Sequence, residues 1–366
     1  MAPETGAGRE LRRGWTTGAC AAAGARAAAE ALLTGRFPDP VTIVLPQGQR
    51  PAFPLAQAEL APGRATAGVT KDAGDDPDVT HGALILTTVE RGAAGSDIVF
   101  RAGEGVGTVT RAGLTLAVGE PAINPAPRAQ IRQALADAVA VAGGDPGQLD
   151  FIVTVAIPGG ARLAEKTLNA RLGIVGGLSV LGTSGIVVPY SCAAWIHSIH
   201  RGIDVARAAG LSHLAAATGS TSEAAVKAMY ELDEIALIDM GDFAGGTLKY
   251  LRNHPVPRLT VAGGFGKLTK LAAGHLDLHS GRSRVDGGYL SALLADLGAA
   301  REIVAGAAAA QSAGEVLHVA SAAGLPLAAT VAARAREVAL ATLAGGIAVD
   351  VAVFDRQGNL IGHAGP

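Results

Sequence analysis

The most polar stretch of the chain runs from Lys71 to Gly82 and contains four aspartates, one lysine and one histidine. Carboxylates and an imidazole in one loop are the groups that general acid–base catalysis uses. We therefore take His81, Asp75 and Asp78 as the candidate catalytic groups. Two alternatives stay open: a solvated turn rich in Asp, Gly and Pro, and a Ca²⁺ or Mg²⁺ site, although the spacing differs from that of an EF-hand.

A second candidate is the glycine-rich turn that follows an apolar stretch at 178–181, where we expect a short strand. Glycine permits a positive φ and a close approach of the backbone to a ligand. The turn can therefore line up free N–H groups as an anion-binding concavity. Its four ligand-binding candidates are Gly182, Thr183, Ser184 and Gly185. The alternative is a tight turn that binds nothing.

Thr16 and Thr17 come directly before a strong alanine-rich helix that we predict over 17–34. Thr17 is the expected N-cap residue. The free N–H groups of a helix N-terminus also bind anions, so both threonines are candidate substrate contacts. Capping alone explains the pair equally well.

The second half of the chain repeats a strand–turn–helix unit three times, with strands expected at 214–217, 234–239 and 259–262. This repeat indicates an open, mainly parallel sheet. Ligands bind at the carboxyl ends of such strands, and an acidic residue there suits the ribose hydroxyls of a nucleoside. The cofactor-binding candidates at these ends are Thr218, Gly219, Asp239, Gly241, Asp242 and Gly264. Ordinary loop chemistry is the alternative.

Basic side chains scattered along the chain are candidates for binding an acidic substrate. They are Arg128, Arg162, Arg171, Lys267, His279 and Arg282. The histidine pairs 197/200 and 275/279 lack the third ligand that a zinc site needs, so we expect no metal site in the protein.

The remaining pattern predicts the elements that hold these groups. Before 190 we expect strands at 41–45, 52–60, 65–69, 83–89, 97–101 and 150–157, and a second helix over 124–142. After it we expect helices over 191–209, 222–231, 243–253, 265–274, 288–313 and 327–345, and further strands at 315–320, 349–354 and 360–363. The predicted fold class is α/β (α+β), with a mixed-sheet domain over 1–190 and a Rossmann-like domain over 191–366.

Composition narrows the class of protein. The 366 residues are 49% apolar, the formal net charge is −2, and there are two cysteines. A disordered chain and a nucleic-acid-binding protein are therefore not expected. No apolar run has the length of a membrane span, and the first 14 residues lack the apolar core of a signal peptide. We expect a cytoplasmic protein, and its alanine-rich surface is compatible with a homodimer.

Seven blocks, in this order along the chain, resemble one family. They are Gly14–Ala21 (GWTTGACA), Gly74–Gly82 (GDDPDVTHG), Gly103–Gly107 (GEGVG), Ala122–Pro125 (AINP), Asn169–Ile174 (NARLGI), Gly176–Val187 (GGLSVLGTSGIV) and Gly266–Gly274 (GKLTKLAAG). Together the blocks resemble the cobalt-precorrin-5B C1-methyltransferases of cobalamin (vitamin B12) synthesis. They are distributed over most of the length of residues 14–285, whereas 286–366 match more loosely.

The resemblance implies an enzyme that uses S-adenosyl-L-methionine to methylate ring carbon 1 of a tetrapyrrole, (cobalt-)precorrin-5B, giving (cobalt-)precorrin-6A. Any cobalt would arrive inside the substrate, and the substrate's carboxylates would meet the basic candidates. Two further classes stay open: a tetrapyrrole carrier without catalysis, and a nucleotide- or NAD-dependent enzyme using the second sheet. None of the three strand–helix turns carries GxGxxG or a P-loop lysine, which argues against the latter.

Overall fold

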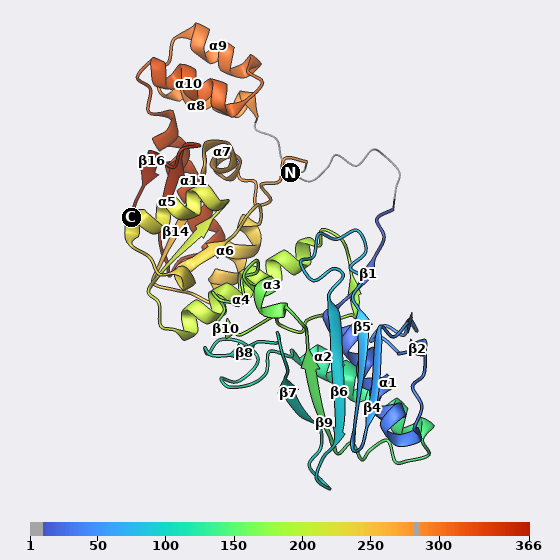
Figure 1. The fold of residues 1–366 in the computed structure, drawn as a ribbon. Helices are drawn as coiled ribbons and strands as arrows, with labels where there is room; N and C mark the ends of the chain where they lie inside the picture. Colours follow the sequence, from blue (N-terminus) through green and yellow to red (C-terminus); the bar gives the residue numbers. More distant parts are fainter. Residues whose placement is uncertain (1–9, 282–285) are drawn as a thin grey trace. The chain divides into compact units, whose positions relative to one another are not determined.

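The computed structural model describes residues 10–281 and 286–366, which form two compact units (Figure 1). Unit 1 ends at Ser191 and unit 2 spans Cys192–Pro366. Among the described helices, none combines the length and the apolar character needed to cross a membrane.

Unit 1 is built on a five-stranded sheet in the order β4-β5-β6-β9-β7. The strands are β4 (Gln57–Ala61), β5 (Arg64–Thr70), β6 (Leu84–Arg91), β9 (Phe151–Ala156) and β7 (Val99–Ala102). All neighbours are antiparallel except β7 and β9. Residues of β6 and β9 alternate between buried and half-buried, as expected where one face of a sheet is covered.

Helix α1 (Thr17–Thr34) covers the sheet at β5 and β6 and also packs against α2 (Pro125–Val141) (Figure 1). Its small side chains permit a close approach: a Cβ on Gly24 would lie 2.9 Å from Thr87 Oγ1. The Thr87 hydroxyl donates to the carbonyl of Ala21 at 3.0 Å, so the buried strand hydroxyl is satisfied by the helix.

Short elements complete unit 1. They are β1 (Gly14–Trp15), β2 (Val41–Thr42), β3 (Ala52–Phe53), β8 (Thr108–Val109), α3 (Gly160–Ala164), β10 (Ile174–Val175) and β11 (Ile186–Val187). The pairing of β1 with β11 joins residues far apart in sequence. The short strand expected at 178–181 does not form. Instead, Leu178 and Val180 make isolated bridges to Val106 and Ile123.

Unit 2 contains a five-stranded sheet in the order β13-β12-β14-β15-β16. The strands are β12 (His213–Ala217), β13 (Leu237–Asp239, after a 3₁₀ turn at Glu234–Ala236), β14 (Arg258–Gly264), β15 (Ala348–Phe354) and β16 (Leu360–Ala364). The first four strands are parallel and β16 is antiparallel. The expected mainly parallel sheet, and with it the α/β fold class, is confirmed.

Helices cover both faces of this sheet (Figure 1). Helices α4 (Cys192–Ala208), α6 (Ala244–Asn253), α7 (Phe265–Ala272) and α11 (Leu327–Leu343) share one core with Leu214 and Ala216 of β12. Helix α5 (Ser220–Tyr230) packs on the opposite face, against Ala215 and Ala217. In the sheet, β13 follows β12 in the chain and lies on one side of it, whereas β15 follows β14 and lies on the opposite side. The two connections therefore run in opposite directions from the neighbouring strands β12 and β14. Such a switch point is where ligands bind in open α/β sheets.

The segment 288–320 agrees with the expectation in its first part only. The helical stretch expected over 288–313 consists of two helices, α8 (Gly287–Asp296) and α9 (Arg301–Ala309), and Gly298, with φ +75, follows the end of α8. The predicted strand at 315–320 is helix α10 (Ala313–Ala322). Its N-cap, Ser312, accepts the N–H of Glu315 at 3.2 Å, and this cap favours the helix over the β-branched content of the segment.

Candidate functional site

Three segments of unit 1 meet at the N-terminus of α1: residues 12–19, 71–82 and 181–190, here called the loop cluster. Backbone hydrogen bonds join them, from Trp15 N to Asp72 O at 2.7 Å and from Thr16 N to Gly185 O at 3.0 Å. The backbone N–H of Tyr190 donates to the carboxylate of Asp76 at 2.8 Å. The fold thus brings together the threonine pair, the aspartate loop and the glycine turn.

Both threonines of the pair are engaged inside the protein. Thr16, not Thr17, is the N-cap residue, and its hydroxyl accepts the N–H of Ala19 at 3.1 Å. The expected cap at Thr17 is therefore wrong. The Thr17 hydroxyl instead donates to Leu181 O at 3.1 Å and accepts Leu181 N–H at 2.8 Å. These bonds fix the glycine turn to the helix, and contact of either threonine with substrate stays a prediction.

Neighbouring protein atoms leave no room for a side chain at the two glycines of the turn. Gly182 has φ +126, and a Cβ there would lie 2.1 Å from Thr16 Oγ1. Gly185 has φ +81, and a Cβ there would lie 2.5 Å from Leu45 Cδ2. The close approach of protein to protein therefore accounts for both residues without a ligand.

Gln130 of α2 lies beneath this turn and is buried. Its Nε2 donates to Gly182 O at 2.8 Å, whereas its Oε1 is a buried acceptor with no partner among the described residues. A carbonyl oxygen seeks a hydrogen-bond donor and repels an anion. This side chain therefore gives no support to anion binding at the turn, where Thr183 is exposed and Ser184 Oγ bonds the backbone of Ile186.

Asp78 is the counter-ion of a buried lysine. Lys71 is 1% exposed, and its Nζ lies 2.6 Å from Asp78 Oδ2. The other oxygen, Oδ1, accepts the N–H and the hydroxyl of Thr80 at 2.8 and 2.6 Å. Burial alone would raise the pKa of Asp78, but the charge of Lys71 and these hydrogen bonds together lower it. Asp78 is thus ionised, and both of its oxygens are occupied.

His81 and Asp75 face outwards from the same loop. His81 Nδ1 accepts the backbone N–H of Ala73 at 3.1 Å, so the neutral ring carries its proton on Nε2, and 54% of the side chain is exposed. Asp75 Oδ2 accepts the backbone N–H of Arg12 at 2.7 Å, while Oδ1 has no hydrogen-bond partner in the described chain. His81 therefore offers a donor, and Asp75 offers an acceptor.

Arg12 also donates from Nη1 and Nη2 of its guanidinium group to the two carboxylate oxygens of Asp72. This hydrogen bonding lowers the pKa of Asp72 to about 2. The pair ties the segment before β1 to the aspartate loop.

In unit 2, register brings the predicted strand ends to one edge of the sheet. Ala217 of β12 lies opposite both Asp239 of β13 and Ala262 of β14. Gly219 is the N-cap of α5 and Gly264 the N-cap of α7. Neither glycine is required by backbone strain or by crowding: Gly219 is extended, Gly264 has φ −71, and a Cβ on either would meet nothing within 4 Å.

The end of β13 carries Asp239, Gly241 and Asp242. Gly241 has φ +54, and Asp242 forms an ion pair with Lys267 of α7. The indole N–H of Trp195 donates to the backbone carbonyl of Asp239 at 3.2 Å. Lys267 is therefore held at this edge by a carboxylate.

The remaining basic candidates are dispersed. The Arg128 guanidinium binds Glu120 and the carbonyl of Ile123. Arg162, in α3, is exposed and has no ion-pair partner among the described residues. Arg171 is half-buried, and His279 is exposed with Nδ1 accepting the N–H of Gly281 at 3.1 Å. Arg282 lies outside the described residues.

Comparison with known proteins decides the family. The sequence profile described as CbiD matches residues 4–189, and that of the CbiD C-terminal domain matches residues 277–365. A protein of Bradyrhizobium sp. named cobalt-precorrin-5B C(1)-methyltransferase is 62% identical over 356 residues, 97% of this chain and 94% of that protein. The chain belongs to the CbiD family. The resemblance drawn from the motifs is confirmed.

Two further relatives and one solved structure are similar to this chain. Proteins of the same name from Brucella anthropi and Brucella canis are each 56% identical over 353 residues, 96% of this chain and 95% of theirs. The crystal structure titled cobalamin biosynthesis protein (cbiD) from Archaeoglobus fulgidus is 27% identical, with a TM-score of 0.40, covering 74% of this chain and 83% of that chain.

Four side chains at the candidate sites of this CbiD protein were not predicted to act there. They are Arg12, Lys71, Gln130 and Trp195. Lys71 belongs to the polar stretch, which suggests an exposed side chain. Its position directly after the apolar strand β5 is the one feature of the sequence that indicates its burial. The others bind residues 44 to 60 positions away in sequence, so no local pattern reveals them.

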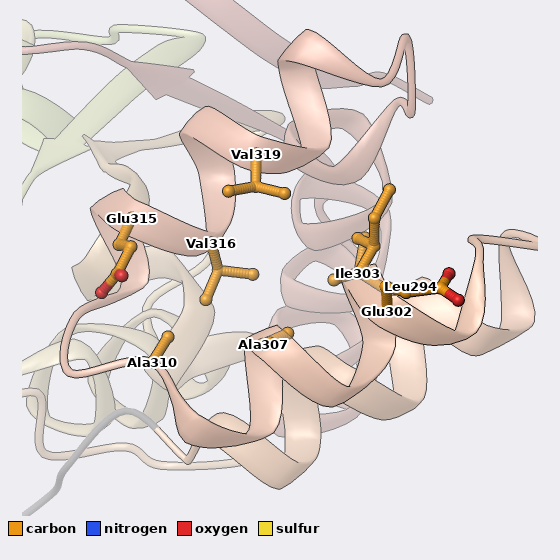
Figure 2. A pocket seen from close by; sticks show the side chains of 9 residues that line it. Leu294, Glu302, Ile303, Ala307, Ala310, Glu315, Val316 and Val319 are labelled. Atoms are coloured by element: carbon orange, nitrogen blue, oxygen red, sulfur yellow. The ribbon is translucent and has the colours of Figure 1, made fainter.

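The cavity of about 310 Å³ between α8, α9 and α10 is a different place (Figure 2). Apolar side chains such as Leu294, Ile303 and Val316 line it, and Glu302 and Glu315 also belong to its lining. It contains no candidate site residue, so we do not assign it to the reaction. Over residues 10–281 and 286–366, no group of three or more His, Cys, Asp or Glu side chains is arranged to hold a metal ion.

Proposed function

We propose that this protein is a cobalt-precorrin-5B C1-methyltransferase of cobalamin synthesis that uses S-adenosyl-L-methionine and yields cobalt-precorrin-6A. The observation that carries the proposal is the name shared by relatives 62% and 56% identical to nearly the whole chain. Its proposed setting is the cytoplasm, since the sequence contains only two cysteines, Cys20 and Cys192, which lie far apart in the chain.

The proposed donor site is the carboxyl edge of the unit 2 sheet rather than the turn at 182–185. Glycine costs conformational entropy, so glycines without a packing reason suggest space kept for a ligand. Gly219 and Gly264 are of that kind, whereas Gly182 is not. Asp239 stands 20 residues after Gly219 (239 − 219) at the end of the next strand, the position from which an acid binds ribose hydroxyls in nucleotide-binding sheets.

The chemistry asks the protein mainly to position two partners. A nucleophilic ring carbon attacks the sulfonium methyl group, the S–CH₃ bond breaks, and S-adenosylhomocysteine leaves as a neutral thioether. The positive charge passes to the macrocycle and is discharged by loss of a ring proton to a base. The proposed base is Asp75, which is exposed and whose Oδ1 has no hydrogen-bond partner among residues 10–281 and 286–366.

The proposed role of His81 is to donate from Nε2 to a carboxylate of the substrate, because Nδ1 is already an acceptor. Arg162 is proposed for the same purpose, since it is exposed and unpaired among the described residues. Asp78 is proposed to hold the loop through Lys71 rather than to transfer a proton. The other basic candidates and the threonine pair stay predicted substrate contacts.

Calorimetric titration with S-adenosylhomocysteine, with NAD and ATP as controls, tests the proposal. Selective binding of S-adenosylhomocysteine, together with mass-spectrometric gain of one methyl group by precorrin-5B, supports it. Binding of NAD or ATP alone would identify a nucleotide-dependent enzyme. A precorrin bound tightly but never methylated in the presence of the donor would identify a carrier.

A further inference from the structure

Trp195 lies in the first turn of α4, and 45% of the residue is exposed. Its indole N–H donates to the carbonyl of Asp239 at 3.2 Å. The ring covers Gly241, where a Cβ would lie 3.4 Å from Nε1. Phe243 supports it at 6.5 Å between ring centroids. The ring is therefore fixed at the end of β13 by a hydrogen bond and by contacts on one side.

A fixed, exposed aromatic ring is a preorganised surface for a flat ligand. Because the hydrogen bond already restricts the side chain, little rotamer entropy remains to be lost on binding. Gly241 contributes by its positive φ, which glycine adopts without strain and which sets the course of the backbone beneath the indole.

The neighbouring charges decide which flat ligand fits. The end of β13 carries two carboxylates, Asp239 and Asp242. Asp242 is paired with Lys267, and the carboxylates at this edge suit a donor that bears a sulfonium cation and ribose hydroxyls. Trp195 binds the backbone of the same Asp239 that is proposed to hold the ribose, so a base attached to that ribose reaches the indole.

We propose that Trp195 is the platform on which the adenine ring of the methyl donor stacks. This inference rests on the proposed function, and it adds the residue that recognises the base. Stacking of a base on an aromatic side chain needs no base-edge hydrogen bonds, so Trp195 contributes affinity for the adenosyl group as a whole.

The sequence contains two tryptophans, which makes fluorescence a direct test. In the Trp15→Phe variant the indole signal comes from Trp195 alone. We expect S-adenosylhomocysteine and 5′-methylthioadenosine to quench it saturably, and homocysteine, which lacks the adenosyl group, to leave it unchanged. Trp15 packs edge-to-face on Phe53 in unit 1, so phenylalanine keeps an aromatic contact there.

Calorimetry measures the effect on affinity. Trp195→Ala should weaken binding of both adenosyl ligands by about tenfold or more. Trp195→Phe should weaken it less, because a smaller ring remains, and Trp15→Phe should leave the Kd unchanged. Circular dichroism and thermal unfolding check that each variant is folded.

Either of two results overturns the platform. One is a Kd for Trp195→Ala within twofold of the wild type, which would leave the proposed methyltransferase function standing. The other is an absence of saturable quenching in Trp15→Phe, because a ring fixed before the ligand arrives must respond to it. The methylation assay on the wild-type protein decides the function separately.

Discussion

Lys71 Nζ lies 2.6 Å from Asp78 Oδ2, and the lysine side chain is 1% exposed while that of the aspartate is 26% exposed. The ammonium is thus the more deeply buried partner and depends on the carboxylate for compensation. Removing one member of a buried pair costs more than removing both, because it leaves an uncompensated charge.

Asp78→Asn should therefore destabilise the protein by about 3–5 kcal/mol in urea unfolding. Lys71→Met should cost less, since Asp78 keeps the hydrogen bonds from Thr80 and partial contact with water. The double variant should be more stable than Asp78→Asn alone. A folded, fully stable Asp78→Asn protein without activity would instead assign Asp78 a catalytic role.

Gly182→Ala tests the docking of the glycine turn onto α1. The new Cβ would lie 2.1 Å from Thr16 Oγ1 in a backbone with φ +126. Gly176→Ala is a matched control, because Gly176 also has a positive φ, +88, but nothing lies within 4 Å of a Cβ there. The control should cost about 1 kcal/mol, and Gly182→Ala at least about twice that, because the collision adds to the strain. An equal loss of stability in the two variants, measured by thermal unfolding, would show that the turn moves to accommodate the new methyl group.

The sequence predicts the sheet of unit 2 well because each strand–turn–helix unit is local: its apolar run, its glycine and its helix follow one another. The helix at 313–322 was missed because Val316, Leu317 and Val319 resemble a strand. Ser312 and Glu315 nevertheless have the spacing of a capping box, which was the overlooked signal.

The candidate sites were predictable only in part. Sequence motifs identify the aspartate loop and the strand ends. Which hydrogen bonds and ion pairs each side chain forms, however, depends on contacts between residues far apart in the sequence. Asp72 and Arg12 are 60 residues apart, and Thr17 and Leu181 are 164 apart. Such long-range contacts also decide which ring nitrogen of His81 accepts a hydrogen bond and whether other atoms leave room for a Cβ at a given glycine.

Asp350 provides a prediction of pH dependence. It is fully buried and accepts hydrogen bonds from Tyr230 Oη at 2.6 Å, Arg258 Nε at 3.0 Å and Thr260 Oγ1 at 2.9 Å. His363 Nε2 lies 3.6 Å away. Burial opposes ionisation, but these hydrogen bonds and the charge of Arg258 together lower the pKa of Asp350.

A lowered folded-state pKa stabilises the protein above the unfolded value of about 3.9. The contribution is lost as pH falls through the lower, folded pKa. Asp350→Asn should cost about 3 kcal/mol at pH 7, and the difference from wild type should shrink below about pH 4. Asp145→Asn, an exposed carboxylate that caps the N–H of Gly147, should stay within about 0.5 kcal/mol. Urea midpoints between pH 7 and 3 measure this, and a difference that is constant with pH would contradict it.

Gly264→Ala tests the proposed donor site without touching the core. A methyl group there meets no protein atom within 4 Å and the backbone is compatible with alanine, so the expected loss of stability is that of alanine at the N-cap of α7, at most about 1 kcal/mol. Because the methyl group enters the space kept at the switch point, the Kd for S-adenosylhomocysteine should rise about tenfold, a loss of about 1.4 kcal/mol. Gly306→Ala in α9 is the control, since a Cβ there is equally unopposed. If the Gly264→Ala protein binds S-adenosylhomocysteine with unchanged affinity, this edge of the sheet is excluded as the donor site.

Asp75 and His81 can be separated by steady-state kinetics. A base acts in the transition state, so Asp75→Asn should lower kcat by about 10²–10⁴. The asparagine amide oxygen still accepts the N–H of Arg12, which keeps the loop in place. A donor to a substrate carboxylate contributes to binding, so His81→Ala should raise KM about tenfold, a loss of about 1.4 kcal/mol, and leave kcat within threefold.

His81→Gln is the informative companion, because its amide N–H₂ can replace the donor at Nε2 but cannot act as a base. Partial recovery of KM in this variant supports the donor role, since the N–H is the feature that the two side chains share. A large fall in kcat for both His81 variants at unchanged KM would reverse the assignment. The imidazole would then be the base, which requires the hydrogen bond from Ala73 N–H to Nδ1 to break, so that Nδ1 can accept the proton or the ring can adopt the other tautomer.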